Sequence, residues 1–546
     1  MPVPTTWMPG AHARARVPAG EAMHPRRAAL LLVFVVAIAY SSSIGVPFQF
    51  DDGVVITGEP AITGFHVDPA SHRFLGDLSF AVSYRLFGER PLGYHVVNIA
   101  IHAANALLVL RLGRLLFRTQ ALRSARAAGE RVALLGALVF AAHPLNTQAV
   151  TYIVQRYASL AAGFFLLATC SYLAFRLASS ARAAAGFYAL FLASAAAALW
   201  TKENAFVLPL AVLLVELSFF SAPARKRLLF LSPFLIGAAA AVAVALASGL
   251  SLEGLDRATR VGTDMPRSDY ALTQLRVVAS YLRLLVLPVG QNIDHDVPLS
   301  RSILDPRVLL AASVHASLLA GAALAIARGS RGNALWRLVG FGISWFYVAL
   351  LVESSFVPIV DVMFEHRAYL PSVGFFLAAA GALAALPTLS PARRWGVLTV
   401  ALVVALTALT LARNRVWQSD ATLWADAASK SPNKPRPLNN VGVALLTRGD
   451  PAEAIVWFRR AIRADPAYTK AHFNLGEALQ KVGACEEAIA AYETFLGQVP
   501  EYPDTYRNLA DCYRETGRPE IAAWFGEAYT RIMRERAGRP LPVSLR

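Results

Sequence analysis

The chain has 546 residues, of which 56% are hydrophobic and only 16% are charged. A soluble domain carries about 25% charged residues, so much of this chain must face an environment other than water. Residues from Arg413 onward contain 19 basic and 16 acidic side chains, so the preceding part carries +13 of the net charge of +16. Basic residues placed between apolar segments are typical of a membrane protein. The sequence has no basic stripe on a soluble face, which argues against a nucleic-acid partner.

The part before Arg413 contains the apolar segments of a membrane helix bundle. A helix needs about 20 mostly apolar residues to cross a bilayer. The first segment follows a short Arg-rich tail, 1–27, and lacks a small-residue cleavage site, which favours an uncleaved membrane helix. About eleven spans are predicted, at residues 28–47, 92–112, 132–150, 157–177, 183–200, 204–221, 228–249, 305–328, 335–353, 367–388 and 395–412.

The basic residues predict the orientation of these spans. Arg-rich and Lys-rich stretches precede the first span, link alternate later spans and precede the last one. They all fall on one side if the N-terminus is cytoplasmic, which places the C-terminal part on the opposite face. Residues 273–290 are apolar but contain Arg276 and Arg283. If they spanned the bilayer, the later basic loops would lie outside, so an interfacial or re-entrant helix is predicted there.

A repeat of 34 residues occupies the C-terminal part. Glycine recurs at that step at Gly449, Gly483 and Gly517, and small residues fill a close-packing position at Ala444, Ala478 and Cys512. Paired helices at a period of 34 residues are typical of tetratricopeptide repeats. Stacked repeats form a curved solenoid whose concave face binds protein, although a docking spacer would have the same pattern. No framework of paired cysteines or zinc spacing accompanies them.

Ionisable residues gather on the predicted non-cytoplasmic face. Such groups are costly at membrane depth and usually line a cavity or pair with one another. Each has a plain alternative, since an acidic pair can simply be solvated and Lys202-Glu203 can be a local ion pair that ends a helix. The set comprises Asp51, Asp52, His143, Arg156, Lys202, Glu203, Asp294, His295, Asp296, Glu365, His366 and Arg367.

Several of these residues stand in motifs that occur in a fixed order along the chain. Phe50-Asp51-Asp52 follows the first span, His143-Pro-Leu-Asn-Thr-Gln-Ala-Val-Thr-Tyr-Ile-Val-Gln-Arg156 and Lys202-Glu203-Asn204 come next, and Glu365-His-Arg-Ala-Tyr-Leu-Pro371 begins the tenth span. Together with Pro288-Val-Gly-Gln-Asn-Ile-Asp-His-Asp296, this arrangement resembles the transmembrane and tetratricopeptide-repeat O-mannosyltransferases and their bacterial relatives. These proteins belong to the C-type glycosyltransferase (GT-C) superfamily, and the resemblance covers nearly the whole chain after residue 28.

The resemblance implies an enzyme that uses a sugar carried on a polyprenyl phosphate, with Asp51 and Asp52 at the active site. A carboxylate there can accept the proton of an acceptor hydroxyl, and either aspartate could be that base. Cations would bind the leaving lipid phosphate, because Arg and Lys are phosphate ligands. The expected donor-phosphate and substrate residues are His143, Arg156, Lys202, Glu203, Glu365, His366, Arg367 and Tyr369, with His295 and Asp296 as further candidates. A divalent metal is an open question.

The predicted fold is therefore all-α, a GT-C-like membrane bundle followed by a tetratricopeptide-repeat solenoid. The predicted parts are a cytoplasmic tail (1–27), a transmembrane domain (28–412) with a periplasmic loop (48–91), a linker and partial repeat (413–435), three repeats (436–536) and a tail (537–546).

The predicted function is transfer of mannose or another hexose from the lipid-linked donor to a protein or glycan hydroxyl. The repeats would bind the acceptor or a partner. The alternatives are a non-enzymatic scaffold for envelope assembly and a transporter of lipid-linked glycan. A bacterial inner membrane with periplasmic repeats is the predicted location.

Overall fold

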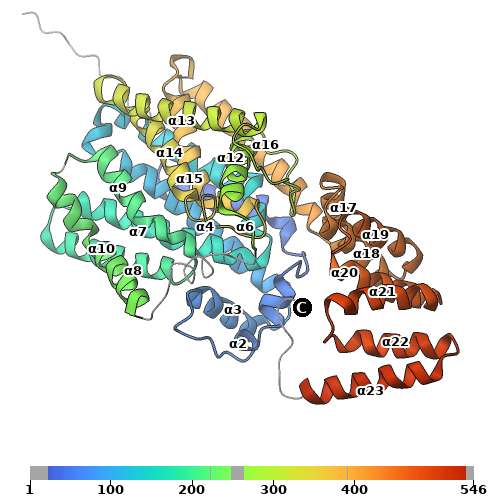
Figure 1. The fold of residues 1–546 in the computed structure, drawn as a ribbon. Coiled ribbons are helices and arrows are strands. Elements are labelled where there is room, and N and C mark those ends of the chain that lie inside the picture. The colour runs from blue at the N-terminus through green and yellow to red at the C-terminus, as the bar shows by residue number, and fades with distance from the viewer. Residues whose placement is uncertain (1–22, 222, 248–262, 390, 537–546) are drawn as a thin grey trace, which may run out of the picture.

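Every regular element in the described parts of the chain is a helix, as the sequence predicts. The structure is a computed structural model that describes residues 23–221, 223–247, 263–389 and 391–536. A membrane-type bundle leads into a curved row of shorter helices, drawn in orange to red in Figure 1. The predicted tails 1–27 and 537–546 lie largely or wholly outside the described residues.

Each of the eleven apolar segments contains a helix. Six helices in the described ranges are long and apolar enough to cross a membrane, or seven if a pair bent by 50° near residue 143 is one span. The number of spans therefore stays a prediction, because several of the eleven segments form helices that are shorter than the bilayer requires. The bundle helices are α1 (Pro25–Ala39), α4 (Pro91–Leu116), α5 (Gly129–Ala142), α7 (Arg156–Arg176), α8 (Ala181–Leu199), α9 (Leu208–Phe219), α10 (Ala224–Ala247), α13 (Pro306–Arg331), α14 (Leu335–Leu350), α15 (Tyr369–Ala384) and α16 (Ala392–Val416).

Glycine allows α14 and α15 to cross closely. A Cβ atom on Gly342 would collide with the Gly374 carbonyl, and one on Gly374 would lie 2.5 Å from the Trp345 ring. Small residues at such a crossing let two membrane helices approach each other to the backbone. The indole of Trp345 also donates a 3.1 Å hydrogen bond to the Leu370 carbonyl, which fixes the start of α15.

The segment at 273–290 forms α12 (Arg267–Val286), which is not among the helices apolar enough to span. The Tyr270 and Tyr281 hydroxyls each donate a 2.9 Å hydrogen bond to a backbone carbonyl, of Glu353 and Phe364 respectively. Helix α12 therefore holds the irregular segment that follows α14. Its relation to the membrane remains a prediction.

The first loop after α1 is folded rather than extended. It contains a π-helical turn (Gly53–Thr57), the short α2 (Pro60–Thr63) and α3 (Phe74–Phe87). The loop packs into one hydrophobic cluster with Trp417 and Trp424, which lie after α16. This cluster joins the loop that carries Asp51 and Asp52 to the start of the repeats.

The repeats form antiparallel helix pairs. The three repeated glycines end the first helix of each pair with φ of +93°, +79° and +76°, a conformation that favours glycine because it has no Cβ. Phe458 and Tyr492 are one 34-residue step apart, and their rings pack against Gly442 and Gly476, which are separated by the same step. The helices are α17 (Asp420–Lys430), α18 (Pro435–Arg448), α19 (Pro451–Ala464), α20 (Thr469–Lys481), α21 (Cys485–Gln498), α22 (Pro503–Glu515) and α23 (Pro519–Arg536).

Candidate functional site

Asp51 and Asp52 lie on a strained turn. Phe50 has a φ of +52°, which is costly for a residue with a Cβ, and such strain often occurs at functional sites. The backbone N–H of Asp51 donates to the Tyr152 hydroxyl at 3.0 Å. Tyr152 stacks against Trp417, with ring centroids 5.6 Å apart, so the turn is held by residues from distant parts of the chain.

Asp52 is a buried anchor. Its two carboxylate oxygens accept hydrogen bonds from the backbone N–H groups of Gln49 and Val154, at 3.0 and 2.7 Å. The residue is 1% exposed. Burial raises the pKa of Asp52 to about 8, although the two backbone hydrogen bonds oppose that shift. Its position indicates that it fixes the turn and leaves no face open to a substrate.

Asp51, in contrast, is exposed. The protein around it is nevertheless dense enough to raise the pKa of its carboxyl, while the charges of Arg436 and Lys470 oppose that shift. The guanidinium of Arg436 lies over the Phe50 ring, 5.3 Å from its centroid. Asp51 therefore faces solvent and the first helices of the repeat array.

Arg436 belongs to an ion-pair network between the repeats and the membrane bundle. It donates to both Asp294 oxygens at 2.6 and 2.8 Å and also pairs with Asp361. Lys434 pairs with Asp294 as well. The Asp294 pKa is lowered, because the bonds from Arg436 and Lys434 outweigh the effect of burial. The sequence indicates no partner for Lys434 and Arg436, which lie where the linker meets the first repeat, and it does not single out Asp361, which stands between two apolar residues.

Glu365 organises the loop beside this network. Its carboxylate accepts hydrogen bonds from His295 Nε2 at 2.9 Å, the Asn292 backbone N–H at 2.6 Å and Gln291 Nε2 at 3.2 Å. Two predicted site residues, Glu365 and His295, are thus brought together. Asp296 is exposed, and its backbone N–H donates to the Ser431 hydroxyl at 3.1 Å.

Lys202 and Glu203 bind different partners. The Lys202 ammonium forms a buried pair with Glu353 at 2.6 Å. Glu203 instead accepts hydrogen bonds from Arg73 at 3.1 Å and pairs with His72 at 2.8 Å. Burial alone would raise the Glu203 pKa, but the charge of Arg73 makes the net shift a lowering.

Arg367 carries a charge that no described carboxylate binds directly. Its guanidinium donates to the backbone carbonyls of Glu353, Val362 and Asp361, the last at 2.7 Å. Beside it, His366 is 7% exposed and its Nδ1 has no hydrogen-bond partner. Because Asp361 contacts both Arg367 and Arg436, this cationic group adjoins the network next to Asp51.

Three predicted residues lie apart, enclosed in the bundle. Arg156 donates to Asn98, Tyr94, Ser79 and Ser83 and is fully buried. His143 uses both ring nitrogens, with Leu145 and Leu285. The Tyr369 hydroxyl binds His102 at 2.7 Å. These three side chains position helices, and the structure does not bring them to Asp51.

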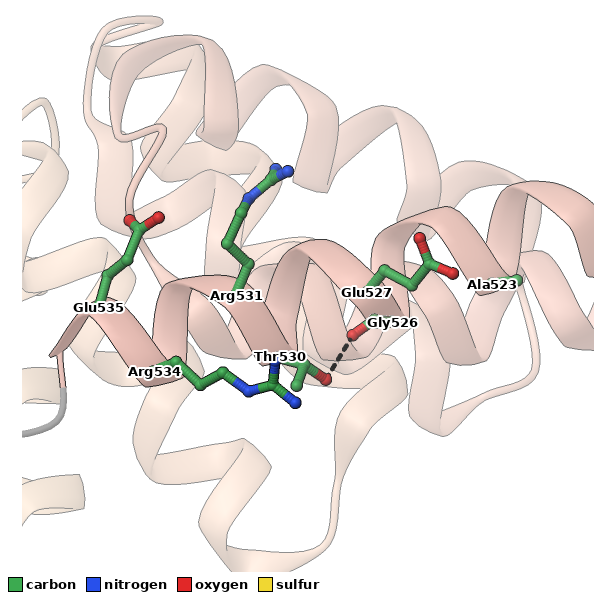
Figure 2. Close-up of a pocket in the computed structure, with 7 residues that line it drawn as sticks. All are labelled: Ala523, Gly526, Glu527, Thr530, Arg531, Arg534 and Glu535. Carbon is green, nitrogen blue, oxygen red and sulfur yellow. Dashed lines mark hydrogen bonds between the residues drawn. The ribbon is translucent and has the colours of Figure 1, made fainter.

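No group of three metal-binding side chains suited to hold an ion occurs among the described residues. A hollow on α23, shown in Figure 2, is lined by Ala523, Gly526, Glu527, Thr530, Arg531, Arg534 and Glu535. None of the predicted site residues lines it. The exposed Asp51 with the neighbouring cationic groups is therefore the candidate site.

Comparisons with known proteins agree with the two-part organisation. Residues 442–483 match a family described as TPR repeat, and residues 473–540 match one described as Tetratricopeptide repeat. A solved structure titled "Crystal structure of MamA protein" covers 27% of this chain and 85% of its own, with 18% identity and a TM-score of 0.22, which is too low to support an argument.

Several relatives match most of the chain, among them the following two. The protein named Protein O-mannosyl-transferase TMTC3 of Mus musculus is 25% identical over 82% of this chain. Protein O-mannosyl-transferase F38B6.6 of Caenorhabditis elegans is 24% identical over 80%. The chain spans 52% and 63% of the length of these two relatives. The predicted resemblance is confirmed: the chain is a multi-pass membrane protein with C-terminal tetratricopeptide repeats and a homologue of the transmembrane and tetratricopeptide-repeat protein O-mannosyl-transferases.

Proposed function

We propose that this chain is a glycosyltransferase that moves a hexose, with mannose the first candidate, from a polyprenyl-phosphate donor to a protein hydroxyl. The names of its relatives support this activity. The observation that carries the proposal is the exposed Asp51 beside cationic side chains, on a turn that the buried Asp52 holds in place. A reaction between a hydroxyl and a lipid phosphate ester needs this combination of a base and cations.

In this proposal Asp51 is the general base and Asp52 a positioning residue. The Asp51 carboxylate accepts the proton of the acceptor hydroxyl while the hydroxyl oxygen bonds to the anomeric carbon. The bond from that carbon to the phosphate oxygen breaks, and the lipid phosphate leaves with the electron pair. Direct displacement inverts the configuration at the sugar. A hydrolase would use two carboxylates at a set separation across the sugar, whereas only one of this pair faces solvent.

Arg367 and His366 are the proposed phosphate ligands. The Arg367 guanidinium donates to three backbone carbonyls and forms no ion pair with a described carboxylate, so its charge is available to stabilise an anion, and a guanidinium fits phosphate in a fork. The unpartnered Nδ1 of His366 can donate one more hydrogen bond when it carries the proton. Burial lowers the pKa of His366, and the charges of Lys202 and Arg73 lower it further, so more positive charge lies nearby.

Donor consumption by the purified full chain tests this assignment. Wild-type protein is given a radiolabelled polyprenyl-phosphate mannose and an acceptor protein in detergent micelles. Replacing Asp51 with Asn should lower kcat by about a hundredfold or more without changing the melting temperature, because it removes only the base. Asp51→Glu, which keeps a carboxylate, should retain part of the activity and serves as the matched control.

Asp52→Asn should mainly lower stability, since it replaces one of two oxygens that accept backbone N–H groups with an amide donor. Full activity of Asp51→Asn would contradict the assignment of the base. A wild-type protein inert toward polyprenyl-phosphate glucose, mannose and galactose alike would contradict the donor class.

The location and boundaries belong to the same proposal. We place the chain in a bacterial inner membrane with a cytoplasmic N-terminus and periplasmic repeats, because the basic loops then lie on one side. The proposed domains are the transmembrane part 28–412, the linker 413–435 and the repeats 436–536.

A further inference from the structure

An aromatic groove lies between two repeats of the array. It is a hollow of about 510 Å³ lined by the loop before α20, the first turns of α20, the end of α21 and Tyr502. Three rings form its apolar wall: Phe473 lies 5.2 Å from Phe495 and 5.1 Å from Tyr502, between ring centroids. Phe473 and Tyr502 are only partly buried, so their rings are accessible from the groove.

One edge of the groove belongs to the hydrophobic cluster that also includes Phe50, the neighbour of Asp51. Tyr468, at one edge of the groove, packs in the same hydrophobic cluster as Phe50 and Trp424. The Phe50 ring in turn lies 5.4 Å from the Trp424 ring, edge to face. Lys470, which also lines the groove, is close enough for its charge to act on the Asp51 carboxyl. Tyr468 and Lys470 therefore mark the side of the groove that is nearest to Asp51.

The polar lining suits a polypeptide. The Asn474 side chain donates to Asn439 Oδ1 at 2.8 Å, which leaves its own carbonyl oxygen to accept a backbone N–H. Asn440 stands one 34-residue step earlier and is likewise partly exposed. Amides repeated along a solenoid match the repeated N–H and C=O groups of an extended chain, and a pocket then selects a side chain. A lipid or a lone sugar offers no such repeated main-chain groups.

We propose that this groove binds an extended segment of the acceptor polypeptide, with an aromatic or large aliphatic side chain between Phe473, Phe495 and Tyr502, and so presents a nearby Ser or Thr hydroxyl to Asp51. This inference rests on the proposed function for the role of Asp51, whereas peptide binding itself does not. The acceptor would thus be chosen by a side chain beside the modified hydroxyl rather than by the hydroxyl alone.

Selection from a random nine-residue peptide library displayed on phage tests the groove without any need for activity. The full chain in lipid nanodiscs is the target, and a library with a fixed central Thr is the probe. We expect enriched peptides to carry Phe, Tyr, Trp or Leu at a constant spacing from that Thr. Enrichment without any such preference would overturn the inference.

Variants then locate the binding. A synthetic consensus peptide should bind Phe473→Leu about tenfold more weakly than wild type, because Leu keeps the apolar core but loses the ring surface. Lys470→Glu should also weaken binding, whereas Lys481→Glu, a charge reversal at the far end of the same helix, should not. Equal affinity for wild type and both groove variants would overturn the inference.

Transfer to the same peptide separates this inference from the proposed function. If the peptide binds in the groove but receives no hexose from any polyprenyl-phosphate donor, the groove stands and the proposed activity fails. If hexose is transferred with the same KM by wild type, Phe473→Leu and Lys470→Glu, the activity stands and the groove is excluded as the acceptor site. The expected result is a raised KM for the peptide in both groove variants, with kcat unchanged in Phe473→Leu.

Discussion

Asp51 and Asp52 are chain neighbours in opposite environments. One carboxylate is exposed, and the other has its two oxygens bound by backbone N–H groups from two segments. Sequence spacing alone could not assign their roles, because adjacent residues on a turn point in directions that depend on the local backbone. Here the left-handed conformation of Phe50 and the hydroxyl of Tyr152 determine which carboxylate faces solvent.

The raised pKa of Asp52 predicts a pH dependence of stability. Burial raises that pKa to about 8, so the folded chain holds a proton that the unfolded chain releases near pH 4. The resulting stabilisation is complete below about pH 4 and is lost as pH rises to about 8, by at most about 1.4 kcal/mol per pH unit. The apparent melting temperature, followed by tryptophan fluorescence in detergent, should therefore fall across this window.

Asp52→Asn cannot ionise, so its melting temperature should vary less with pH than that of wild type. Asp68→Asn, which removes an exposed carboxylate of the same loop, is the matched control and should leave the pH dependence as it is in wild type. Melting curves of wild type and Asp52→Asn that change in parallel with pH would show that Asp52 is ionised throughout.

Helices were the most predictable elements, because long apolar runs in a membrane have to satisfy their backbone groups internally. Each of the eleven segments contains a helix, and the 34-residue period placed the repeat helices. The period could not predict how the linker docks. Lys434 and Arg436 look like solvated charges in sequence, and their carboxylate partners Asp294 and Asp361 are more than 70 residues away.

The close crossing of α14 and α15 predicts a sensitive position. Gly342→Ala should lower stability strongly, since its Cβ would meet the Gly374 carbonyl, a backbone atom that cannot rotate away. Gly396→Ala in α16 is the matched control, because nothing lies within 4 Å of its added Cβ. Size-exclusion profiles and melting temperatures of both variants in detergent measure the difference. Equal stability would contradict the close approach.

For the molecule as a whole, the sequence predicted the two parts and their order, whereas the membrane face on which the polar motifs lie stays a prediction. It could not predict that His143, Arg156 and Tyr369 would be enclosed by their own hydrogen bonds, while Arg367 would donate to backbone carbonyls and form no ion pair with a described carboxylate. A motif records that residues matter but not whether they matter for packing or for a ligand. Only the contacts between distant segments separate those two roles.

The proposed orientation can be measured with single cysteines in a chain whose native cysteines are replaced by alanine. Glu487→Cys, exposed on the repeats, should react with a membrane-impermeant maleimide in intact spheroplasts. Ser124→Cys, exposed in a basic loop of the bundle, should react only after lysis because that loop is expected to be cytoplasmic. The reverse pattern would place the repeats in the cytoplasm.

The ion pairs of Lys434 and Arg436 with Asp294 and Asp361 attach the first helices of the array to the membrane bundle. Units of 34 residues added after α23 would lengthen the array away from these ion pairs and leave the contacts beside Asp51 unchanged. A unit inserted ahead of Lys434 would instead pull both cations away and expose Asp294 and Asp361. Added repeats can therefore extend the array toward larger acceptors after α23 without disturbing these ion pairs.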